Sequence, residues 1–327
     1  MNALMNRRIF GGSLLAGTGA LAVRRLCSTG RLRDRRKNRS RVAILHADSY
    51  DGPLDNTLIE GLRLFGLDLR SKTVLLKPNL VEYIPGSEVN TAPRLVGAAA
   101  SAFLALGAKS VLVGEGPGHQ RDTFLVLAEG GLEKELQSRR IRFVDLNRDE
   151  IRQVPLQSAF TGLDRLWLPR TVLASDVIVS MPKVKTHHWA GVTLSMKNMF
   201  GIMPGVAYGW PKNLLHCKGI DRSILDINAA VPAHFVIADG IISMEGNGPL
   251  HGSPRNLGRI VLADDPVAAD FVCTRLMGLN PLRVNYLAQA AEFLGNGTTD
   301  RIVQLAEPLS APKQPFALLP EFAHMRI

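Results

Sequence analysis

The sequence predicts an α/β fold with a mostly parallel sheet flanked by helices, and two observations carry this prediction. Short apolar runs alternate with segments of helical periodicity throughout residues 42–327, as in chains built from strand–helix units. The runs are apolar at successive positions, which is typical of strands covered on both faces. A composition of 46% hydrophobic and 21% charged residues excludes disordered and collagen-like chains.

Six of the apolar runs are predicted to be strands, because each is short and continuously apolar. In chain order the predicted strands are residues 42–45, 73–76, 110–113, 176–180, 235–238 and 260–263.

The clearest helix is expected over residues 91–107. Thr91 can cap its start, Pro93 suits the first turn and Gly107 suits the end. Apolar residues recur there at i, i+4 and i+8, the spacing of a buried helix face. Weaker helical patterns cover residues 53–65, 121–137, 220–230, 266–277 and 282–294.

Residues 183–222 do not fit this alternation. They are rich in Lys, His and Gly, with Pro and Trp among them, and predict a long loop excursion at the carboxyl edge of the sheet with at most one or two short helices. Loops of this length in a compact domain are usually functional or disordered, and the apolar content argues against disorder.

The first 41 residues are expected to lie outside the domain. Residues 1–23 resemble a twin-arginine export signal, in which Arg7-Arg8 precedes Ile9-Phe10 and a weakly apolar run. This predicts the twin-arginine machinery as a partner and a periplasmic or otherwise exported protein. A mitochondrial presequence, and hence a matrix location, is the alternative, because residues 1–33 are Arg-rich and contain no acid. Residues 24–41 are predicted to be a basic linker, which leaves residues 42–327 as a single domain.

The formal net charge of +10 belongs to those first 41 residues. They hold eleven basic residues and one acid, whereas residues 42–327 hold 28 of each sign. A body without net charge gives no reason to expect a specific nucleic-acid partner, since such affinity requires many phosphates to be neutralised. The body also has no apolar stretch of about 20 residues, so no transmembrane helix is expected in it.

Cysteine usage restricts the kinds of metal site. Cys27, Cys217 and Cys273 form no CxxC pair, so the chain lacks the cysteines for a zinc ribbon or a self-contained four-cysteine iron–sulfur site. The adjacent pair His216-Cys217 could supply soft metal ligands, but two neighbouring residues are a weak signal.

Polar motifs follow the predicted strands directly. Because parallel strands present their carboxyl ends at one edge of the sheet, where such sheets bind ligands, these motifs are expected to share one cleft. They are Lys77-Pro78-Asn79, Gly114-Glu115-Gly116-Pro117-Gly118-His119, Met181-Pro182-Lys183-Val184-Lys185-Thr186-His187-His188, Asp239-Gly240 and Asp264-Asp265-Pro266.

Each motif also has a structural interpretation. Lys77-Pro78-Asn79 suits a turn that ends a strand, the glycines of residues 114–118 suit tight backbone geometry, and Asp265 suits the cap of the helix that follows. The segment from Glu245 to Pro249 suits a flexible loop.

The residue types in the cleft divide into three expected roles. Amines and amides suit an anionic ligand, buried Lys, His and Glu suit proton transfer, and carboxylates suit a metal. The expected ligand-binding residues are Lys77, Asn79, Lys183, Thr186, Lys197 and Asn198; the catalytic residues are Lys185, His187 and Glu115; and the metal ligands are Asp239, Glu245 and Asp265.

The ordered motifs resemble the family called domain of unknown function 362, over about residues 42–300. The resemblance rests on Lys77-Pro78-Asn79, residues 114–118, the run MPKVKTHHWAGVTLSMKNMFG from Met181 to Gly201, Asp239-Gly240, Glu245-Gly246-Asn247-Gly248-Pro249 and Asp265-Pro266-Val267-Ala268-Ala269-Asp270. It implies an association with iron–sulfur proteins, since many relatives carry ferredoxin-type cysteine motifs. This chain has none of them. The cofactor is therefore open between a divalent metal and an iron–sulfur cluster not held by cysteines alone.

The sequence therefore predicts an exported α/β protein that binds a small ligand bearing phosphate or carboxylate, as an enzyme or a cofactor-maturation factor. The alternative is a non-catalytic metal- or iron–sulfur-associated redox or partner-binding protein, whose residues 183–222 dock the partner. The substrate and the reaction are not determined by these patterns.

Overall fold

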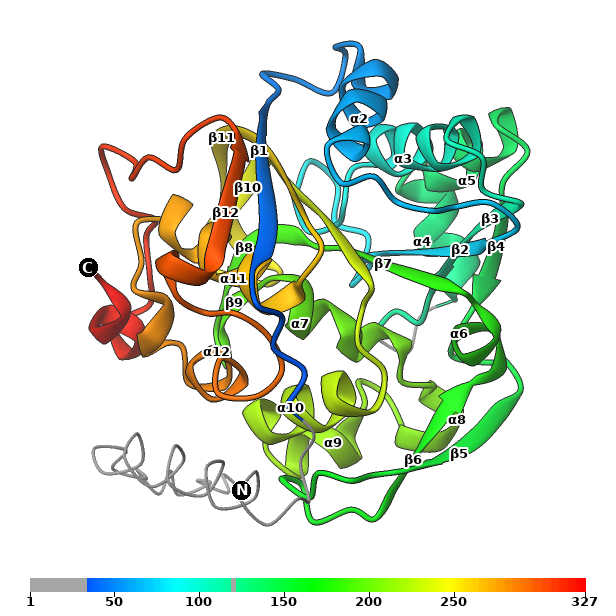
Figure 1. The fold of residues 1–327 in the computed structure, drawn as a ribbon. Helices are drawn as coiled ribbons and strands as arrows, with labels where there is room; N and C mark the ends of the chain where they lie inside the picture. The colour runs from blue at the N-terminus through cyan, green and yellow to red at the C-terminus, as the bar shows by residue number, and fades with distance from the viewer. Residues whose placement is uncertain (1–33, 119–121) are drawn as a thin grey trace, which may run out of the picture.

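Figure 1 shows the computed structural model, which describes residues 34–118 and 122–327. The predicted export signal, residues 24–33 of the predicted linker and His119 lie outside the described residues. The end of the linker lies against the body, where the Arg35 amide donates to the carbonyl of Phe293 and Lys37 Nζ donates to that of Asp264. The first strand begins at Ser40, so the last two linker residues belong to the sheet.

The central sheet of the described chain contains ten strands in the order β12-β1-β11-β10-β7-β2-β3-β4, with β8 paired to β10 and β9 to β8. A separate two-stranded sheet is formed by β5 and β6. The bounds are β1 (Ser40–His46), β2 (Thr73–Pro78), β3 (Ser110–Glu115), β4 (Arg142–Asp145), β5 (Ile151–Pro155), β6 (Arg165–Pro169), β7 (Val177–Met181), β8 (Lys183–His187), β9 (Gly191–Thr193), β10 (Phe235–Asn247), β11 (His251–Ala263) and β12 (Ile302–Ala306).

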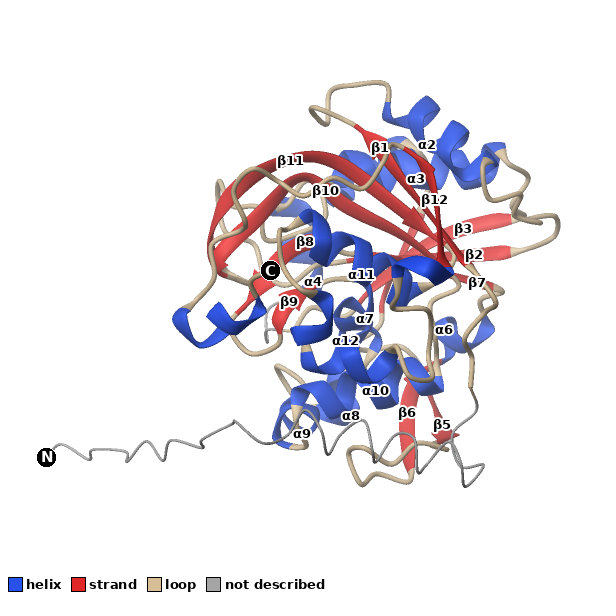
Figure 2. Ribbon diagram, turned by 60° about the vertical axis from the view of Figure 1, so that its left-hand side comes forward, coloured by secondary structure: helices blue, strands red, loops and turns tan. Residues whose placement is uncertain are grey.

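The predicted mostly parallel sheet is confirmed, and all six predicted strands form. The pairings from β10 through β7, β2 and β3 to β4 are parallel, as is that of β1 with β12. Only β11 within this series runs antiparallel to its neighbours β1 and β10. Figure 2 shows β10 and β11 curving away together beyond the other strands, where β8 joins them.

Helices cover both faces of the sheet. The α-helices are α2 (Leu54–Arg63), α3 (Pro93–Ala105), α4 (Thr123–Glu129), α5 (Leu132–Ser138), α6 (Arg170–Ala174), α7 (Ser195–Asn198), α8 (Gly205–Tyr208), α9 (Asn213–Cys217), α10 (Ile220–Ala230), α11 (Pro266–Leu276) and α12 (Asn285–Ala290). The 3-10 helices are η1 (Met199–Ile202), η2 (Pro281–Arg283), η3 (Thr299–Arg301) and η4 (Pro320–Met325). In the described residues, no helix is both long and apolar enough to cross a lipid bilayer.

Two hydrophobic cores lie on opposite faces of the sheet. One joins α2, α3, α4 and α5 to the strands, and the other joins α10, α11 and α12 to them, as the two groups of helices in Figures 1 and 2 indicate. This double cover explains the continuously apolar strands, since β2 is buried at five of its six positions.

Two predicted helices are interrupted. Residues 121–137 form α4 and α5 instead of one helix, because Gly131 adopts a left-handed φ of 75° between them. Residues 282–294 form only the short α12 after η2. The helix expected over residues 91–107 forms as α3, but Thr91 does not cap it: its hydroxyl donates to the carbonyl of Met181, and the Ala92 amide donates to Asp239 instead.

The prediction of a long loop excursion over residues 183–222 is wrong, because this region folds into β8, β9, α7, η1, α8 and α9. All five residues of β8, from Lys183 to His187, are buried. A buried strand that carries two lysines has no hydrophobic pattern, which is why the sequence did not reveal it. The region nevertheless lies at the carboxyl edge of the sheet, where it forms part of a cavity.

Candidate functional site

A cavity of about 320 Å³ lies at the carboxyl ends of β2 and β3, beneath β8, α7 and α9. This volume is at the small end of the range for sites that hold small molecules. Six of the sequence-predicted site residues line it, namely Lys77, Asn79, Glu115, His187, Lys197 and Asn198.

A buried ion pair forms the floor of the cavity. Lys77 is the last residue but one of β2, and Glu115 ends β3. The Lys77 ammonium donates to the Glu115 carboxylate, with both side chains at most 1% exposed. Burial lowers the pKa of Lys77 and raises that of Glu115, while each partner opposes the shift of the other. The Gly116 amide, at 2.9 Å, and the Leu80 amide, at 3.3 Å, also donate to Glu115.

Asn198 fastens α7 to this floor. Its Oδ1 accepts hydrogen bonds from Lys77 Nζ at 2.8 Å and from Asn79 Nδ2 at 3.2 Å. Its Nδ2 donates to the Lys77 carbonyl and to Ser180 Oγ, each at 3.0 Å. The Lys77 and Asn198 side chains are therefore fixed by several bonds each.

Gly201 is required above the ion pair. A Cβ at this position would overlap Oε1 of Glu115 and lie 2.5 Å from Lys77 Nζ. The Gly201 carbonyl accepts a hydrogen bond from the Gly116 amide at 3.0 Å, so the backbone of η1 packs directly on the end of β3.

Lys197 contributes a positive charge that contacts no carboxylate among the described residues. Its Nζ lies 4.5 Å from the centre of the Phe200 ring, and among the described residues it makes no hydrogen bond or ion pair. Burial, followed by repulsion from Lys77, lowers the pKa of Lys197 to about 8. The amine is therefore mostly protonated at pH 7 and exchanges its proton near neutrality.

Lys212 is a second cation of this kind. It is 2% exposed, and its Nζ contacts Oδ1 of Asn147, a neutral acceptor. Burial lowers the pKa of Lys212 to about 8. Its backbone adopts the left-handed region, with φ of 68°, which is unfavourable for a residue other than Gly.

Three imidazoles line the cavity near these amines. His187 Nδ1 accepts the amides of Trp189 at 3.0 Å and Ala190 at 3.2 Å, and burial lowers the pKa of His187 well below its usual value. The neutral ring therefore carries its proton on Nε2, which is a hydrogen-bond donor. Burial also lowers the pKa of His216 to about 4, so this ring is neutral at pH 7.

Two further polar atoms of the cavity lining have no partner within the described residues. These are Asn79 Oδ1 and Thr193 Oγ1, on side chains that are 7% and 3% exposed. A buried polar atom without a hydrogen bond is unfavourable by about 1–3 kcal/mol, so a ligand that satisfies one gains that free energy.

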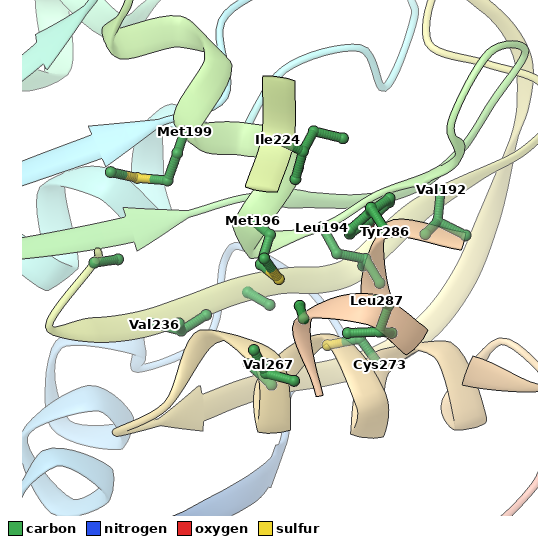
Figure 3. Close-up of a cluster of buried hydrophobic side chains, with 14 of the residues drawn as sticks. Val192, Leu194, Met196, Met199, Ile224, Val236, Val267, Cys273, Tyr286 and Leu287 are labelled. Atoms are coloured by element: carbon green, nitrogen blue, oxygen red, sulfur yellow. The ribbon is translucent and has the colours of Figure 1, made fainter. Parts of the chain in front are cut away.

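Asp270 positions the short helix α7, which carries Lys197 and Asn198. It lies on α11, is fully buried, and accepts the amides of Ser195 at 2.6 Å and Met196 at 3.0 Å. Figure 3 shows the apolar side of this junction, where Leu194 and Met196 lie among side chains from α11 and α12, including Val267, Cys273 and Leu287. The lysine is thus presented from a rigid support.

Three sequence-predicted residues of β8 are buried but do not line the cavity. Lys183 Nζ donates to Glu88 at 2.9 Å and to Asp239 at 3.1 Å. Lys185 Nζ donates to the carbonyls of Val89 and Pro249, and Thr186 Oγ1 donates to that of Gly246. Burial and then the charge of Lys183 lower the pKa of Lys185 well below its usual value.

The carboxylates predicted to hold a metal do not come together. Asp239 accepts from Tyr50 and Lys183, and Glu245 accepts the Ala317 amide. Asp265 lies at the opposite edge of the sheet, because β11 is antiparallel; there it caps α11 by accepting the Val267 amide and also accepts from Ser40 Oγ. The expectation that Asp265 belongs to the cleft is wrong.

The described residues do not fit a metal or cluster. No three His, Cys, Asp or Glu side chains among them are grouped as a metal ion requires. His216 is part of the cavity wall, whereas Cys217 is exposed and Cys273 is buried in the core. In the described part of the chain, no third His, Cys, Asp or Glu side chain joins His216 and Cys217 to form a metal site.

The sequence patterns assigned no site role to several residues at the cavity. Of its lining they are Lys212, His188, Trp189, Thr193 and Phe200, and two supporting residues are Asn147, which contacts Lys212, and Asp270. The available signal was the local charge of residues 183–222, which hold six basic residues and one acid. That excess marked the region, but it did not show which lysines are paired.

Sequence comparisons confirm the resemblance noted in the motifs. The family model described as "Domain of unknown function (DUF362)" matches residues 74–275, which is more than half of the chain. A thylakoid-associated protein of Synechocystis is 31% identical over 282 residues, which is 84% of each protein.

Two solved structures show weaker likeness. A protein from Thermotoga maritima matches with a TM-score of 0.38 and 16% identity, over 63% of this chain and 54% of that one. The lactate racemase apoprotein of Thermoanaerobacterium thermosaccharolyticum matches with a TM-score of 0.46 and 10% identity, over 75% and 58%. This chain thus spans little more than half of either solved chain.

Proposed function

The chain belongs to the family called domain of unknown function 362, whose name gives no reaction, and we propose from the cavity that the protein binds a small anion bearing phosphate or carboxylate. Lys197 and Lys212 would contact the anionic group. Lys77 would act mainly as a structural cation, because Glu115 neutralises it.

One observation carries the proposal: the cavity has more positive charge than negative. Among the described lining residues there are three lysines, and Glu115, which is paired with Lys77, is the one carboxylate. Two ammonium groups then remain in a half-enclosed space without a carboxylate contact in the described chain. A buried charge is unfavourable unless it is paired, and a bound anion would supply the missing partner.

Proton transfer is the chemistry that this site supports best. Lys197, with a pKa of about 8, can release or accept a proton near neutral pH, and the His187 Nε2–H can donate a hydrogen bond to a group that gains negative charge. If the ligand is transformed, we expect Lys197 to exchange the proton and His187 to stabilise the developing charge.

Titration calorimetry with inorganic phosphate tests the proposal. Lys197→Met and Lys212→Met should each weaken phosphate binding by about tenfold or more, the effect of losing one hydrogen bond between charged groups. Lys134→Met is the matched control, because Lys134 is exposed on α5, outside the cavity. Equal phosphate affinity in all four proteins, with each variant folded by circular dichroism, would contradict the proposal.

We also propose that the protein acts outside the cytoplasm. The support is the Arg7-Arg8 motif of the leader and the thylakoid association of the relative from Synechocystis. Replacing Arg7 and Arg8 with Lys in the full-length chain should leave the protein in the cytoplasmic fraction, whereas replacing Arg24 and Arg25 should not. Unchanged fractionation of the Arg7/Arg8 variant would contradict this.

A further inference from the structure

Aromatic rings form a continuous wall on one side of the cavity. His187 stacks on His188 with ring centres 5.0 Å apart, and His188 lies 4.7 Å from Trp189. His216 lies 5.3 Å from Trp189 and 5.1 Å from Phe200. All five residues line the cavity, and they come from β8, the turn after it, η1 and α9.

Trp189 is the member of this wall that is most open to solvent. Its side chain is 57% exposed, although it is held between His188 and His216. Two of the rings that it contacts are anchored, since Nδ1 of His188 and Nδ1 of His216 each bond a backbone carbonyl. A large ring fixed at the cavity with a solvent-exposed surface is a preformed platform for another flat ring.

The imidazoles also give the wall a defined hydrogen-bonding pattern. Nδ1 of His188 lies 2.9 Å from the Gly248 carbonyl, and Nδ1 of His216 lies 3.1 Å from the Lys212 carbonyl. Because a carbonyl only accepts, each Nδ1 must carry a proton, and in the neutral ring Nε2 is then an acceptor. His187 has the opposite tautomer and offers Nε2–H as a donor. The wall therefore presents both donors and acceptors.

We infer that the ligand is a flat nitrogen-containing aromatic ring joined to the anionic group, with the ring against Trp189 and the imidazoles and the anion at Lys197 and Lys212. This inference rests on the proposed function and specifies its ligand class. A simple inorganic anion would use the lysines and leave the wall unused. A plain hydrocarbon ring would stack but would not pair with the imidazole nitrogens.

The distribution of charge along the cavity supports this orientation. Lys197 comes from α7 and Lys212 precedes α9, whereas three of the five rings come from β8 and the turn that follows it. His216, in the last turn of α9, is the link between the two, because its ring contacts Trp189 and its Nδ1 bonds the carbonyl of Lys212. A ligand of mononucleotide size or smaller suits a cavity of about 320 Å³.

The test compares four phosphate compounds by titration calorimetry at pH 7: inorganic phosphate, phenyl phosphate, pyridoxine 5′-phosphate and adenosine monophosphate. At least one of the two nitrogen-containing ring phosphates should bind about tenfold or more tightly than inorganic phosphate, and more tightly than phenyl phosphate. Trp189→Ala should remove most of that gain while leaving the affinity for inorganic phosphate unchanged.

Trp167→Ala is the matched control, since Trp167 is also exposed, at 38%, but lies on β6 away from the cavity lining. It should change none of the four affinities. The inference is overturned if the nitrogen-containing ring phosphates bind no more tightly than inorganic phosphate or phenyl phosphate, or if Trp189→Ala weakens all four equally. Either result would leave the proposed binding of the anion at Lys197 and Lys212 unaffected. Absence of binding by all four compounds would overturn the proposed function as well.

Discussion

Lys183 and Lys197 lie at the same edge of the sheet, yet their ammonium groups have opposite surroundings. Lys183 Nζ is surrounded by the carboxylates of Glu88 and Asp239, the Tyr50 hydroxyl and the Ile242 carbonyl, all within 3.1 Å. Lys197 Nζ faces a ring and a cavity and has no carboxylate partner in the described chain. Burial alone therefore does not distinguish a functional lysine from a structural one. The distinguishing feature of Lys197 is that it lines a cavity and contacts no carboxylate in the described chain.

The difference follows from the elements that carry the two lysines. Lys183 begins β8, which pairs with β10, and Asp239 of β10 is its register partner. Asp239 also accepts the Ala92 amide at the start of α3, so this ion pair joins a strand, a helix and the hairpin of β10 and β11. Lys197 belongs to a helix of four residues, α7. Asp270 accepts the amides of Ser195 and Met196, and Asn198, at the end of this helix, donates to the Lys77 carbonyl and to Ser180 Oγ, so the helix is held without a contact to the Lys197 ammonium. The first lysine is a structural connection, and the second is presented to the cavity.

The largest effect that we predict is on stability, at the paired lysine. Lys183→Met should lower the free energy of unfolding by about 3–5 kcal/mol, because it leaves Asp239 buried without its partner. Urea denaturation measures this change. Lys72→Met is the control, since the Lys72–Asp176 pair is 4.0 Å apart and about 40% exposed, and it should change stability by less than about 1 kcal/mol. An equal loss of stability in Lys183→Met and Lys72→Met would contradict the structural role of the buried Lys183 ion pair.

The next effect is on the pH dependence of anion binding, at the unpaired lysines. Lys197 and Lys212, with pKa values of about 8, carry a charge below that pH and lose it above. Affinity should therefore be high and nearly constant up to about pH 7 and fall through pH 8, by about tenfold between pH 7 and pH 9 for each lysine that contacts the anion. The His216 ring is neutral across this range, since its pKa is about 4, and His187 is also held neutral.

Sulfate is the appropriate probe for that series, because its charge is constant while phosphate loses a proton near neutrality. Calorimetry at intervals from pH 6.5 to pH 9.5 measures the change. A sulfate affinity that is constant through pH 8, in a protein that stays folded, would show that neither amine contributes its charge to binding.

The sequence predicted the sheet well, because strands covered on both faces give continuous apolar runs, as residues 73–76 and 110–113 do. It also located Lys77, Glu115 and Asn79 correctly at one edge, since parallel strands must end together. Asp265 lies at the other edge, because β10 and β11 form an antiparallel hairpin that the sequence did not indicate.

Long-range pairing explains the remaining errors. Whether Lys183 or Lys197 is free depends on Glu88 and Asp239, which are distant in the chain. Lys212 and His216 reach the cavity only because the region after β9 folds back over the ends of β2 and β3, and no local pattern encodes that return. The export signal lies outside the described residues and stays a prediction.

The most direct test of the account is the phosphate titration of Lys197→Met and Lys183→Met side by side, in conditions where both variants are folded. We predict that Lys197→Met loses about tenfold or more in phosphate affinity. Lys183→Met should keep the affinity of the unmodified protein despite its lower stability. Retained affinity in Lys197→Met, together with lost affinity in Lys183→Met, would contradict the account and would move the anion site to the buried pair on β8.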